Sequence, residues 1–312
     1  MTFWALHYCT LADLFSIIKR MKKILNTFKR AKANNQGPLI SFEIFPPKGT
    51  LTLDSARETA SQLVDLHPDF ISVTYSAGGS NNGNATNDIA ALLQDELDMA
   101  TMAHLTCVNA TKESIANALE DLQQKGIENV LALRGDLVQG QKASESFHYA
   151  IDLIPLLKEK GFCVGAAAYP EGHPTVLDPE VNIEHLKAKQ DAGADFFVTQ
   201  LFFDNEVFYR FWDKALNAGI TAPITCGIMP FMSKDQVQRM VFMCGASLPG
   251  HIVKILTKYE NDKESLLKAG IEYAAQQLID LAEHGVDGLH LYTMNKPEVA
   301  RTCMKLLRET WQ

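Results

Sequence analysis

The sequence lacks the signals of several protein classes. Its six cysteines are scattered among 312 residues, and no two of them form a Cys-x-x-Cys pair. This excludes a zinc ribbon and a disulfide framework, and it is typical of a reducing compartment. No apolar run approaches the roughly 20 residues that span a bilayer. Residues 3–18 are fairly apolar but have no positive leading segment and no small-residue cleavage site, so we predict a cytoplasmic protein without a signal peptide.

Charge of one sign is not concentrated along the chain. The 29 basic and 37 acidic residues give a net charge of −8, and the basic cluster at residues 19–23 is interpreted as a solvated helix face. Nucleic-acid binding needs a basic stripe and is not expected. No Gly/Ser-rich linker divides the chain, and 46% hydrophobic residues are enough for one large core.

The sequence does contain a regular alternation of strand and helix patterns. We expect strands at residues 39–45, 70–75, 103–108, 129–133, 163–168, 196–201, 224–228 and 288–291. Helical patterns include residues 111–125, 150–160, 183–192, 206–218 and 262–283, and several close with a glycine that is typical of a left-handed cap. Eight such units predict an α/β fold, a closed (β/α)8 TIM barrel in a single domain. We predict an N-terminal extension over residues 1–36, helical or frayed, and the barrel over residues 37–312.

Polar side chains gather where the predicted strands end. In the first strand Ile40, Phe42 and Ile44 form an apolar face toward the helices, whereas Ser41 and Glu43 point to the barrel axis. TIM barrels carry their active sites at the carboxyl ends of the strands. The residues at those ends include Glu43, Thr74, Tyr75, His104, Arg134, Gly135, Asp136, Tyr169, Glu171, His173, Gln200, Tyr292 and Asn295. This asymmetry predicts an active site there.

Two carboxylates at the barrel mouth are candidates for catalysis, and each has a structural alternative. Glu43, in Ser-Phe-Glu-Ile-Phe-Pro-Pro, suits a general acid and equally a structural carboxylate bonded to a neighbouring barrel residue. Asp136 follows Leu-Arg-Gly and, taken alone, favours a turn or N-cap aspartate. We expect no metal site, because the first strand has no His-x-His pair and Glu171 with His173 is a weak pattern.

Two other features suggest phosphate binding only weakly. The glycine-rich stretch at residues 78–83 lacks the G-x-G-x-x-G spacing, so we predict a loop there. Lys187 and Lys189 follow the fifth strand on a helix and are placed to meet a phosphate, although lysines on a surface helix usually mean solvation.

Eight motifs, taken in order, resemble those of the methylenetetrahydrofolate reductase family. They span roughly residues 38–308, nearly the whole chain, and an ordered set is far more specific than a single motif. The motifs are Ser41-Phe-Glu-Ile-Phe-Pro-Pro47, Ser72-Val-Thr-Tyr75, His104-Leu-Thr-Cys107, Leu131-Ala-Leu-Arg-Gly-Asp136, Ala167-Ala-Tyr-Pro-Glu171, Thr199-Gln-Leu-Phe-Phe-Asp204, Gly227-Ile-Met-Pro230 and Leu291-Tyr-Thr-Met-Asn295.

The resemblance implies a bacterial-type flavoprotein that consists of the catalytic barrel only. In this family NAD(P)H reduces bound FAD and leaves, and the flavin then passes a hydride to 5,10-methylenetetrahydrofolate. The product, 5-methyltetrahydrofolate, supplies one-carbon metabolism and methionine synthesis. The resemblance also implies small-molecule partners and a homo-oligomer, with no membrane or nucleic-acid partner.

Roles for individual residues follow from the same resemblance. Glu43 matches the general acid that helps to open the folate's five-membered ring, and Asp136 matches a carboxylate that favours the resulting iminium ion. Substrate contacts are implied for Glu43, Gln200, Gln236 and Lys296, with Gln200 shared by folate and nicotinamide. Flavin contacts are implied for Thr74, Tyr75, Ala77, His104, Arg134, Gly135, Asp136, Tyr149, Ala150, Tyr169, His173 and Lys189, the last of these near the phosphates.

Two positions depart from the family pattern. Lys296 stands where an arginine would grip the folate's glutamate carboxylate with two hydrogen bonds, and Met240 where an aromatic side chain would stack on substrate. Three alternatives stay open: another barrel flavoenzyme such as a proline dehydrogenase, a flavin-binding barrel subunit of a larger redox complex, or a non-flavin pterin-binding methyltransferase barrel.

Overall fold

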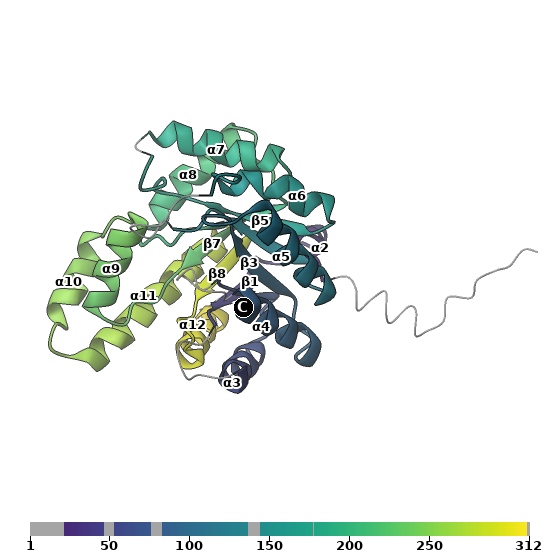
Figure 1. Cartoon of the computed structure of the whole chain (residues 1–312). Helices are drawn as coiled ribbons and strands as arrows, with labels where there is room; N and C mark the ends of the chain where they lie inside the picture. Colours follow the sequence, from purple (N-terminus) through teal and green to yellow (C-terminus); the bar gives the residue numbers. More distant parts are fainter. Residues whose placement is uncertain (1–21, 47–52, 76–82, 137–143, 177, 311–312) are drawn as a thin grey trace, which may run out of the picture.

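A closed ring of eight parallel strands, paired in chain order, organises the molecule (Figure 1). The computed structural model describes residues 22–46, 53–75, 83–136, 144–176 and 178–310. The strands are β1 (Leu39–Ile44), β2 (Phe70–Val73), β3 (Thr101–Thr106), β4 (Asn129–Leu133), β5 (Cys163–Ala168), β6 (Phe196–Thr199), β7 (Ile224–Ile228) and β8 (Gly288–Tyr292). β1 also pairs with β8, which closes the ring. The predicted TIM barrel is confirmed.

Every predicted strand is present, and the differences lie at the strand ends. β3 begins at Thr101, earlier than predicted, while β2 and β6 end sooner, at Val73 and Thr199. The apolar pattern after β6 continues through Leu201, which is buried without belonging to a strand. Hydrophobicity therefore overestimated the length of β6, because burial does not require strand pairing.

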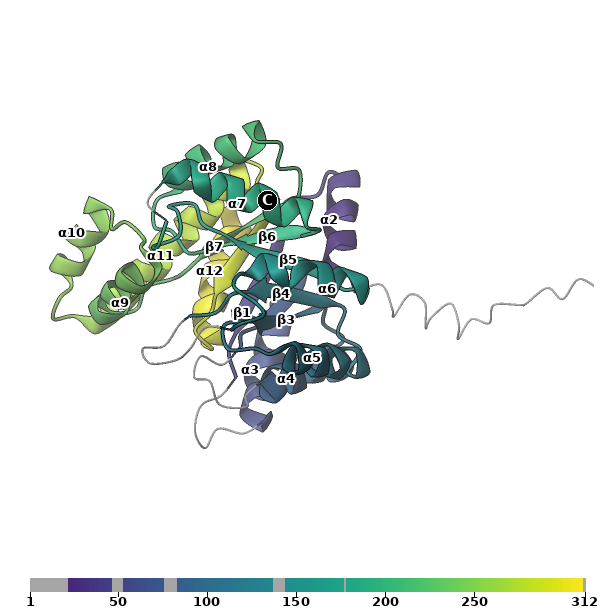
Figure 2. The same ribbon diagram turned by 45° about the horizontal axis from the view of Figure 1, so that its top comes forward.

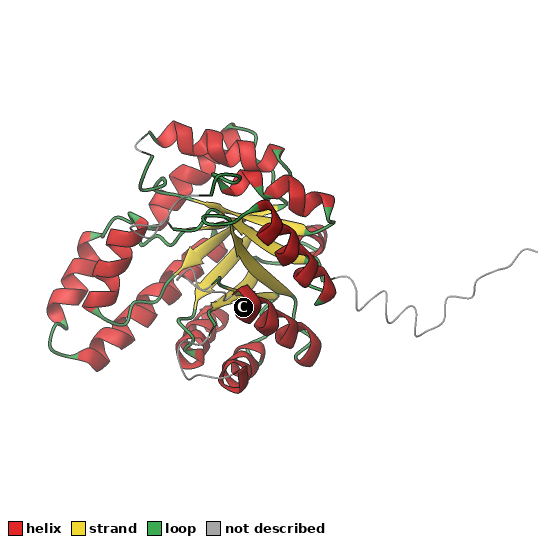
Figure 3. Cartoon of the chain, viewed as in Figure 1, coloured by secondary structure: helices red, strands yellow, loops and turns green. Residues whose placement is uncertain are grey.

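Helices surround the ring on its outside (Figure 3). They are α2 (Ile24–Ala33), α3 (Leu53–Val64), α4 (Gly83–Glu96), α5 (Lys112–Gln124), η1 (Ala150–Asp152), α6 (Ile154–Glu159), α7 (Pro179–Asp191), α8 (Asn205–Asn217), α9 (Lys234–Cys244), α10 (Gly250–Lys258), α11 (Lys263–Glu283) and α12 (Pro297–Thr310). The helix predicted at 150–160 is divided into η1 and α6, and Pro155 lies in the first turn of α6, where its missing N–H is tolerated. None of the described helices is both long and apolar enough to cross a membrane.

Helix α2 covers the amino-terminal end of the barrel and lies away from α9 and α10 (Figure 2). Ile24 and Phe28 are buried, and the ring of Phe28 lies 5.7 Å from that of Phe196 inside the barrel. The Asn129 side chain accepts a hydrogen bond from the backbone N–H of Ile24 at 2.8 Å. Residues 24–33 of the predicted extension are thus a packed helix, while residues 1–21 lie outside the described part of the chain.

The apolar core has separate layers. The main layer lies between the outer faces of the strands and the helices, and it includes Phe42 and Ile44, as the alternation in the first strand predicted. A satellite core joins α9, α10 and α11 to the loops after β6 and β7. Because apolar groups fill the bottom of the barrel under α2, polar groups are left to the opposite end.

Candidate active site

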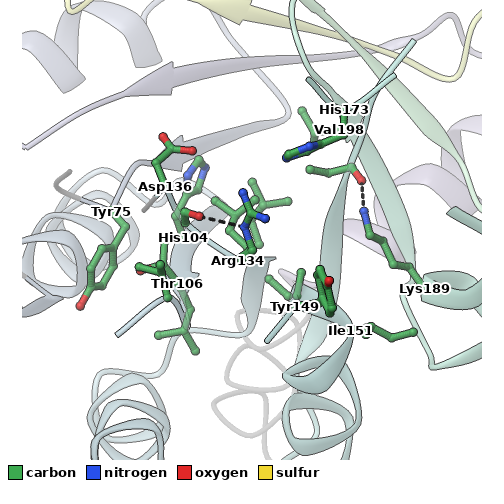
Figure 4. Close-up of a pocket in the computed structure, with 18 of the residues that line it drawn as sticks. Tyr75, His104, Thr106, Arg134, Asp136, Tyr149, Ile151, His173, Lys189 and Val198 are labelled. Carbon is green, nitrogen blue, oxygen red and sulfur yellow. Dashed lines mark hydrogen bonds between the residues drawn. The ribbon is translucent and has the colours of Figure 1, made fainter. Parts of the chain in front are cut away.

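A cavity of about 720 Å³ lies at the carboxyl ends of the strands. It extends from Glu43 at the barrel axis to Ser114 and Ile115 of α5 and Lys189 of α7. Figure 4 shows His104 and Asp136 on one side, Lys189 and Tyr149 on the other, and Arg134 between them. This volume is in the range of small-molecule sites.

The cavity brings together most of the predicted site residues. Glu43 and Gln200 line it, but Gln236 and Lys296 do not. Ala77 and residues 78–82 of the glycine-rich stretch lie outside the described residues. The predicted flavin contacts that line the cavity are Thr74, Tyr75, His104, Arg134, Gly135, Asp136, Tyr149, Ala150, Tyr169, His173 and Lys189.

The Glu43 carboxyl group lies beside two histidines inside the barrel. Its Oε2 is 3.7 Å from Nε2 of His104 and 3.7 Å from Nε2 of His290. Burial lowers the pKa of His104 to about 4, against the opposing effect of Glu43, and His290 lowers it further. Nε2 of His104 is buried and has no hydrogen-bond partner in the described structure. A neutral imidazole with an unused ring nitrogen therefore faces the carboxyl group.

The backbone around Glu43 is held by the loop that follows β8. The Thr293 hydroxyl donates to the Glu43 carbonyl at 2.6 Å, and the Asn295 side chain both accepts from Phe45 N (3.0 Å) and donates to Phe45 O (2.8 Å). Met294 and Asn295 each have φ of 53°, the left-handed region that side chains disfavour. Such a conformation persists where surrounding contacts fix the backbone, as the bonds from Thr293 and Asn295 do here.

A tight turn after β4 brings Asp136 to the cavity. Gly135 in this turn has φ of 86°, and a Cβ there would lie 3.0 Å from Val108 Cγ1 and 3.1 Å from Thr106 Cβ. Only glycine fits such a position. Asp136 thus lies in a turn, which was the structural alternative for this residue. It also lines the cavity as an exposed carboxylate.

The outer end of the cavity is cationic. Lys189 Nζ donates to the Ala167 carbonyl at 2.8 Å and lies 5.5 Å from the centre of the Tyr169 ring. Burial lowers the pKa of Lys189 to about 8. No carboxylate in the described part of the chain pairs with it, whereas Lys187 forms an ion pair with Asp191. Of the two lysines, Lys187 thus forms an ion pair on the helix, whereas Lys189 lines the cavity.

Arg134 extends this cationic end, and the imidazole of His173 lies beside it. Arg134 Nε donates to its neighbour's carbonyl, that of Gly135, at 3.2 Å, and the guanidinium has no ion-pair partner among the residues described. Burial lowers the pKa of His173, and the charges of Arg134 and Lys189 lower it further. His173 packs edge-on against Tyr169, with 5.0 Å between the ring centres. Cations that lack carboxylate partners inside a cavity favour an anionic ligand.

Three residues given substrate-side positions are not brought to this cavity. Gln236 Oε1 accepts from Met232 N at 2.8 Å, so its amide holds the loop before α9. Met240 packs in the satellite core, and Lys296 is exposed beyond β8.

The described residues contain no group of three or more His, Cys, Asp or Glu that could hold a metal ion. Glu171 instead accepts from Ser247 N at 2.9 Å.

His290 was not predicted as a site residue, and Asn295 was predicted at a strand end without a role. His290 lies between Leu289 and Leu291, which both face the main core, so the alternation in β8 points it toward the barrel axis. That alternation was available as a signal. The proximity of His290 to Glu43 could not be predicted from the sequence, because it depends on how β8 is aligned with β1.

Comparison with known proteins identifies relatives of this chain. The sequence model of the family described as methylenetetrahydrofolate reductase matches residues 27–308. The 5,10-methylenetetrahydrofolate reductase of Escherichia coli (strain K12) is 34% identical over 277 residues, covering 88% of this chain and 93% of that protein. Methylenetetrahydrofolate reductase (NADH) 1 of Arabidopsis thaliana is 36% identical over 289 residues, covering 88% of this chain. The chain spans about half the length of the plant relatives that it matches.

A solved structure has the same fold at low sequence identity. It is an uncharacterized protein from Clostridium thermocellum, described as binding two copies of 5-methyl-5,6,7,8-tetrahydrofolic acid. Its TM-score is 0.62 at 15% identity, over 90% of this chain and 98% of that one. At this identity the likeness supports the barrel fold alone.

Proposed function

We propose, because this chain belongs to the methylenetetrahydrofolate reductase family, that it reduces 5,10-methylenetetrahydrofolate to 5-methyltetrahydrofolate. The proposal includes FAD as hydride carrier, NAD(P)H as reductant, a ping-pong order and a cytoplasmic location. One observation carries it: a single cavity has the Glu43 carboxyl group at its axial end and the cations Arg134 and Lys189 toward its outer end. This arrangement suits an acid-assisted reaction beside an anionic cofactor.

The residues of the cavity fit a flavin nucleotide. Lys189 and Arg134 have no carboxylate partner among the described residues and would hold its phosphates. Thr74, His104 and Asp136, which also line the cavity, would contact its ring system. When bound, FAD would supply hydride transfer between the nicotinamide and the folate.

The chain itself would supply the proton and the electrostatic environment. Opening the folate's five-membered ring leaves negative charge on a nitrogen unless that nitrogen is protonated, and Glu43 would give this proton from its carboxyl group. The exposed carboxylate of Asp136 would favour the cationic iminium by its charge. Gln200 would contact nicotinamide and folate in turn, since it lines the same cavity as Glu43. Gln236 and Lys296 stay proposed substrate contacts.

We also propose that the protein assembles as a homo-oligomer. Phe242 and Met243 on α9 are 91% and 60% exposed, which supports association through apolar surface. Light scattering coupled to gel filtration measures the mass in solution. A mass equal to one chain at all concentrations would contradict this part of the proposal.

The reaction is tested by the visible absorbance of the purified protein under anaerobic conditions. We expect a flavin spectrum that bleaches on adding NADH or NADPH and returns on adding 5,10-methylenetetrahydrofolate. Glu43→Gln should keep the bleaching but slow the return by about 100-fold or more, the usual contribution of a general acid.

Glu171→Gln is the matched control, because Glu171 does not line the cavity and its amide can still accept from Ser247 N. It should match the wild type in both phases. A protein that binds no FAD, or whose reduced flavin is not reoxidised by 5,10-methylenetetrahydrofolate, would refute the proposed reaction. Normal folate reduction by Glu43→Gln would refute the role of Glu43 alone.

A further inference from the structure

We propose that His290 is a positioning residue for Glu43: it turns an unprotonated ring nitrogen to the carboxyl group and so orients the proton that Glu43 gives to the substrate. The inference rests on the proposed reductase function. His290 is fully buried and does not line the cavity, so it lies behind Glu43 as seen from the substrates. It acts on the reaction only through the carboxyl group.

The contacts of Ser41 set the tautomer of His290. The Ser41 hydroxyl donates to the Leu289 carbonyl at 3.2 Å, and its oxygen lies 2.8 Å from Nδ1 of His290. A hydroxyl has one proton to donate. Because the Ser41 hydroxyl donates it to the Leu289 carbonyl, the Ser41 oxygen accepts a hydrogen bond from Nδ1–H of His290. In the neutral ring the proton is then on Nδ1, and Nε2 is left as an acceptor.

The acceptor nitrogen faces Glu43. Nε2 of His290 lies 3.7 Å from Glu43 Oε2 and 3.5 Å from the Ser72 hydroxyl. An acceptor nitrogen at this place can take a hydrogen bond from a protonated carboxyl group, whereas a carboxylate has no proton to donate to it. His290 can therefore orient the proton of Glu43 when the carboxyl group carries it, the form that a general acid requires before the reaction.

The groups around the ring keep it in place. Phe70 stacks on His290 with 6.2 Å between ring centres, and Tyr292 packs edge-on at 5.3 Å. The Tyr292 hydroxyl donates to the Thr199 carbonyl at 2.8 Å, so its proton is not directed to Glu43 or His290. His104 is the other titratable group beside the carboxyl group, and its Nε2 has no hydrogen-bond partner in the described part of the chain. The carboxyl group thus lies between two imidazoles.

The separation of 3.7 Å is longer than a hydrogen bond, and the approach depends on the side chain of Glu43. Thr293 and Asn295 fix the backbone at Glu43 and Phe45, so a rotation of the carboxyl group is the movement that shortens the distance. Catalytic hydrogen bonds are often long without substrate and tighten in the complex. We expect substrate above Glu43 to press the carboxyl toward Nε2.

Two pairs of substitutions test the inference, with single-turnover reoxidation of the reduced protein by 5,10-methylenetetrahydrofolate as the readout. Glutamine at position 290 places an amide oxygen near the Nε2 position, whereas asparagine is too short. His290→Asn should slow reoxidation about 10- to 100-fold, the effect of a misplaced catalytic group, and His290→Gln should restore most of the rate. Reduction of the flavin by NADH should not change in either variant.

The second pair compares two buried serines of adjoining strands. Ser41→Ala removes the acceptor for Nδ1–H and frees the ring to take the other tautomer, so it should slow reoxidation and change its pH profile. Ser72→Ala removes the same group at a similar depth but leaves the tautomer set, so it should retain the wild-type profile.

The outcomes separate this inference from the proposed function. A wild-type protein whose flavin is not reoxidised by the folate refutes the reductase function and the role of His290 with it. If the wild type turns over, equal losses in His290→Gln and His290→Asn, or equal pH profiles in the two serine variants, would show a structural role only and overturn the inference.

Discussion

Replacing Lys189 by methionine should stabilise the protein and weaken the proposed binding of FAD. Burial lowers the pKa of Lys189 to about 8 from its ordinary value of 10.5. At about 1.4 kcal/mol per pH unit, the protonated lysine costs the flavin-free protein about 3 kcal/mol at pH 7. Methionine removes this cost and loses the hydrogen bond to Ala167, which is worth about 1–2 kcal/mol. The expected net gain in the free energy of unfolding is about 1–2 kcal/mol.

The protonation of Lys189 also determines how the free energy of unfolding changes with pH. Between about pH 8 and 10.5 the unfolded chain carries the proton on Lys189 and the folded protein does not. The stability of the wild type therefore rises with pH across this window. The advantage of the methionine variant should be complete below about pH 8, shrink as the pH rises, and be gone by about pH 10.5.

Urea unfolding of the flavin-free proteins at several pH values measures the stability, and quenching of flavin fluorescence measures the affinity. Loss of a charged contact of about 1.5–3 kcal/mol predicts FAD binding that is weaker by about 10- to 150-fold. Lys187→Met, two positions away, is the control, because Lys187 is paired with Asp191 on the helix surface and should change stability by less than about 0.5 kcal/mol. A flavin-free Lys189→Met protein less stable than wild type at pH 7, or one with unchanged FAD affinity, would refute the reasoning.

Three further predictions concern the barrel itself. Phe28→Ala should lower the free energy of unfolding by about 3–5 kcal/mol, measured in urea, because the ring is buried beneath the barrel; a loss below 1 kcal/mol would mean that α2 is not part of the cooperative fold. Gly270→Ala would place a Cβ 1.8 Å from the Phe231 carbonyl and should lower the melting temperature strongly, whereas Gly250→Ala, with nothing within 4 Å, should not. Burial raises the pKa of Asp287, so the stability this group contributes is present at low pH and lost as the pH rises through the folded value. Asp287→Asn should thus be more stable than wild type at pH 7 and lose that advantage toward pH 4; a constant difference across this range would contradict it.

Much of the barrel could be predicted from short-range patterns. Alternation within β1 correctly separated Phe42 and Ile44, which face the helices, from Ser41 and Glu43, which face the axis. The five glycines predicted to cap helices all have positive φ, because an αL cap is a local requirement that glycine satisfies: Gly126, Gly161, Gly193, Gly219 and Gly285. The gathering of polar residues at the strand ends predicted the side of the barrel that holds the cavity.

What could not be predicted depends on distant contacts. The sequence shows Lys187 and Lys189 on one helix, but only the packing of α7 on β5 decides which of them reaches the cavity. A helical pattern at residues 24–33 does not say which surface it covers. The resemblance implied a substrate contact for Gln236, but no local pattern indicated that its amide accepts a hydrogen bond from Met232 N in the loop before α9.

The bonds from Thr293 and Asn295 to the backbone at Glu43 and Phe45 have a consequence for the order of folding. They join residues 250 positions apart in the chain. A nascent chain that has emerged as far as Lys189 already contains Glu43, Arg134 and Lys189 itself. Its β1 can pair with β2, but the bonds from Thr293 and Asn295 to the backbone at Glu43 and Phe45 are still missing. Contacts of such separation form late, because loop closure must precede them. The backbone at Glu43 and Phe45 is therefore held from both sides only when the last strand joins the first, so that partly synthesised chains lack part of the cavity wall.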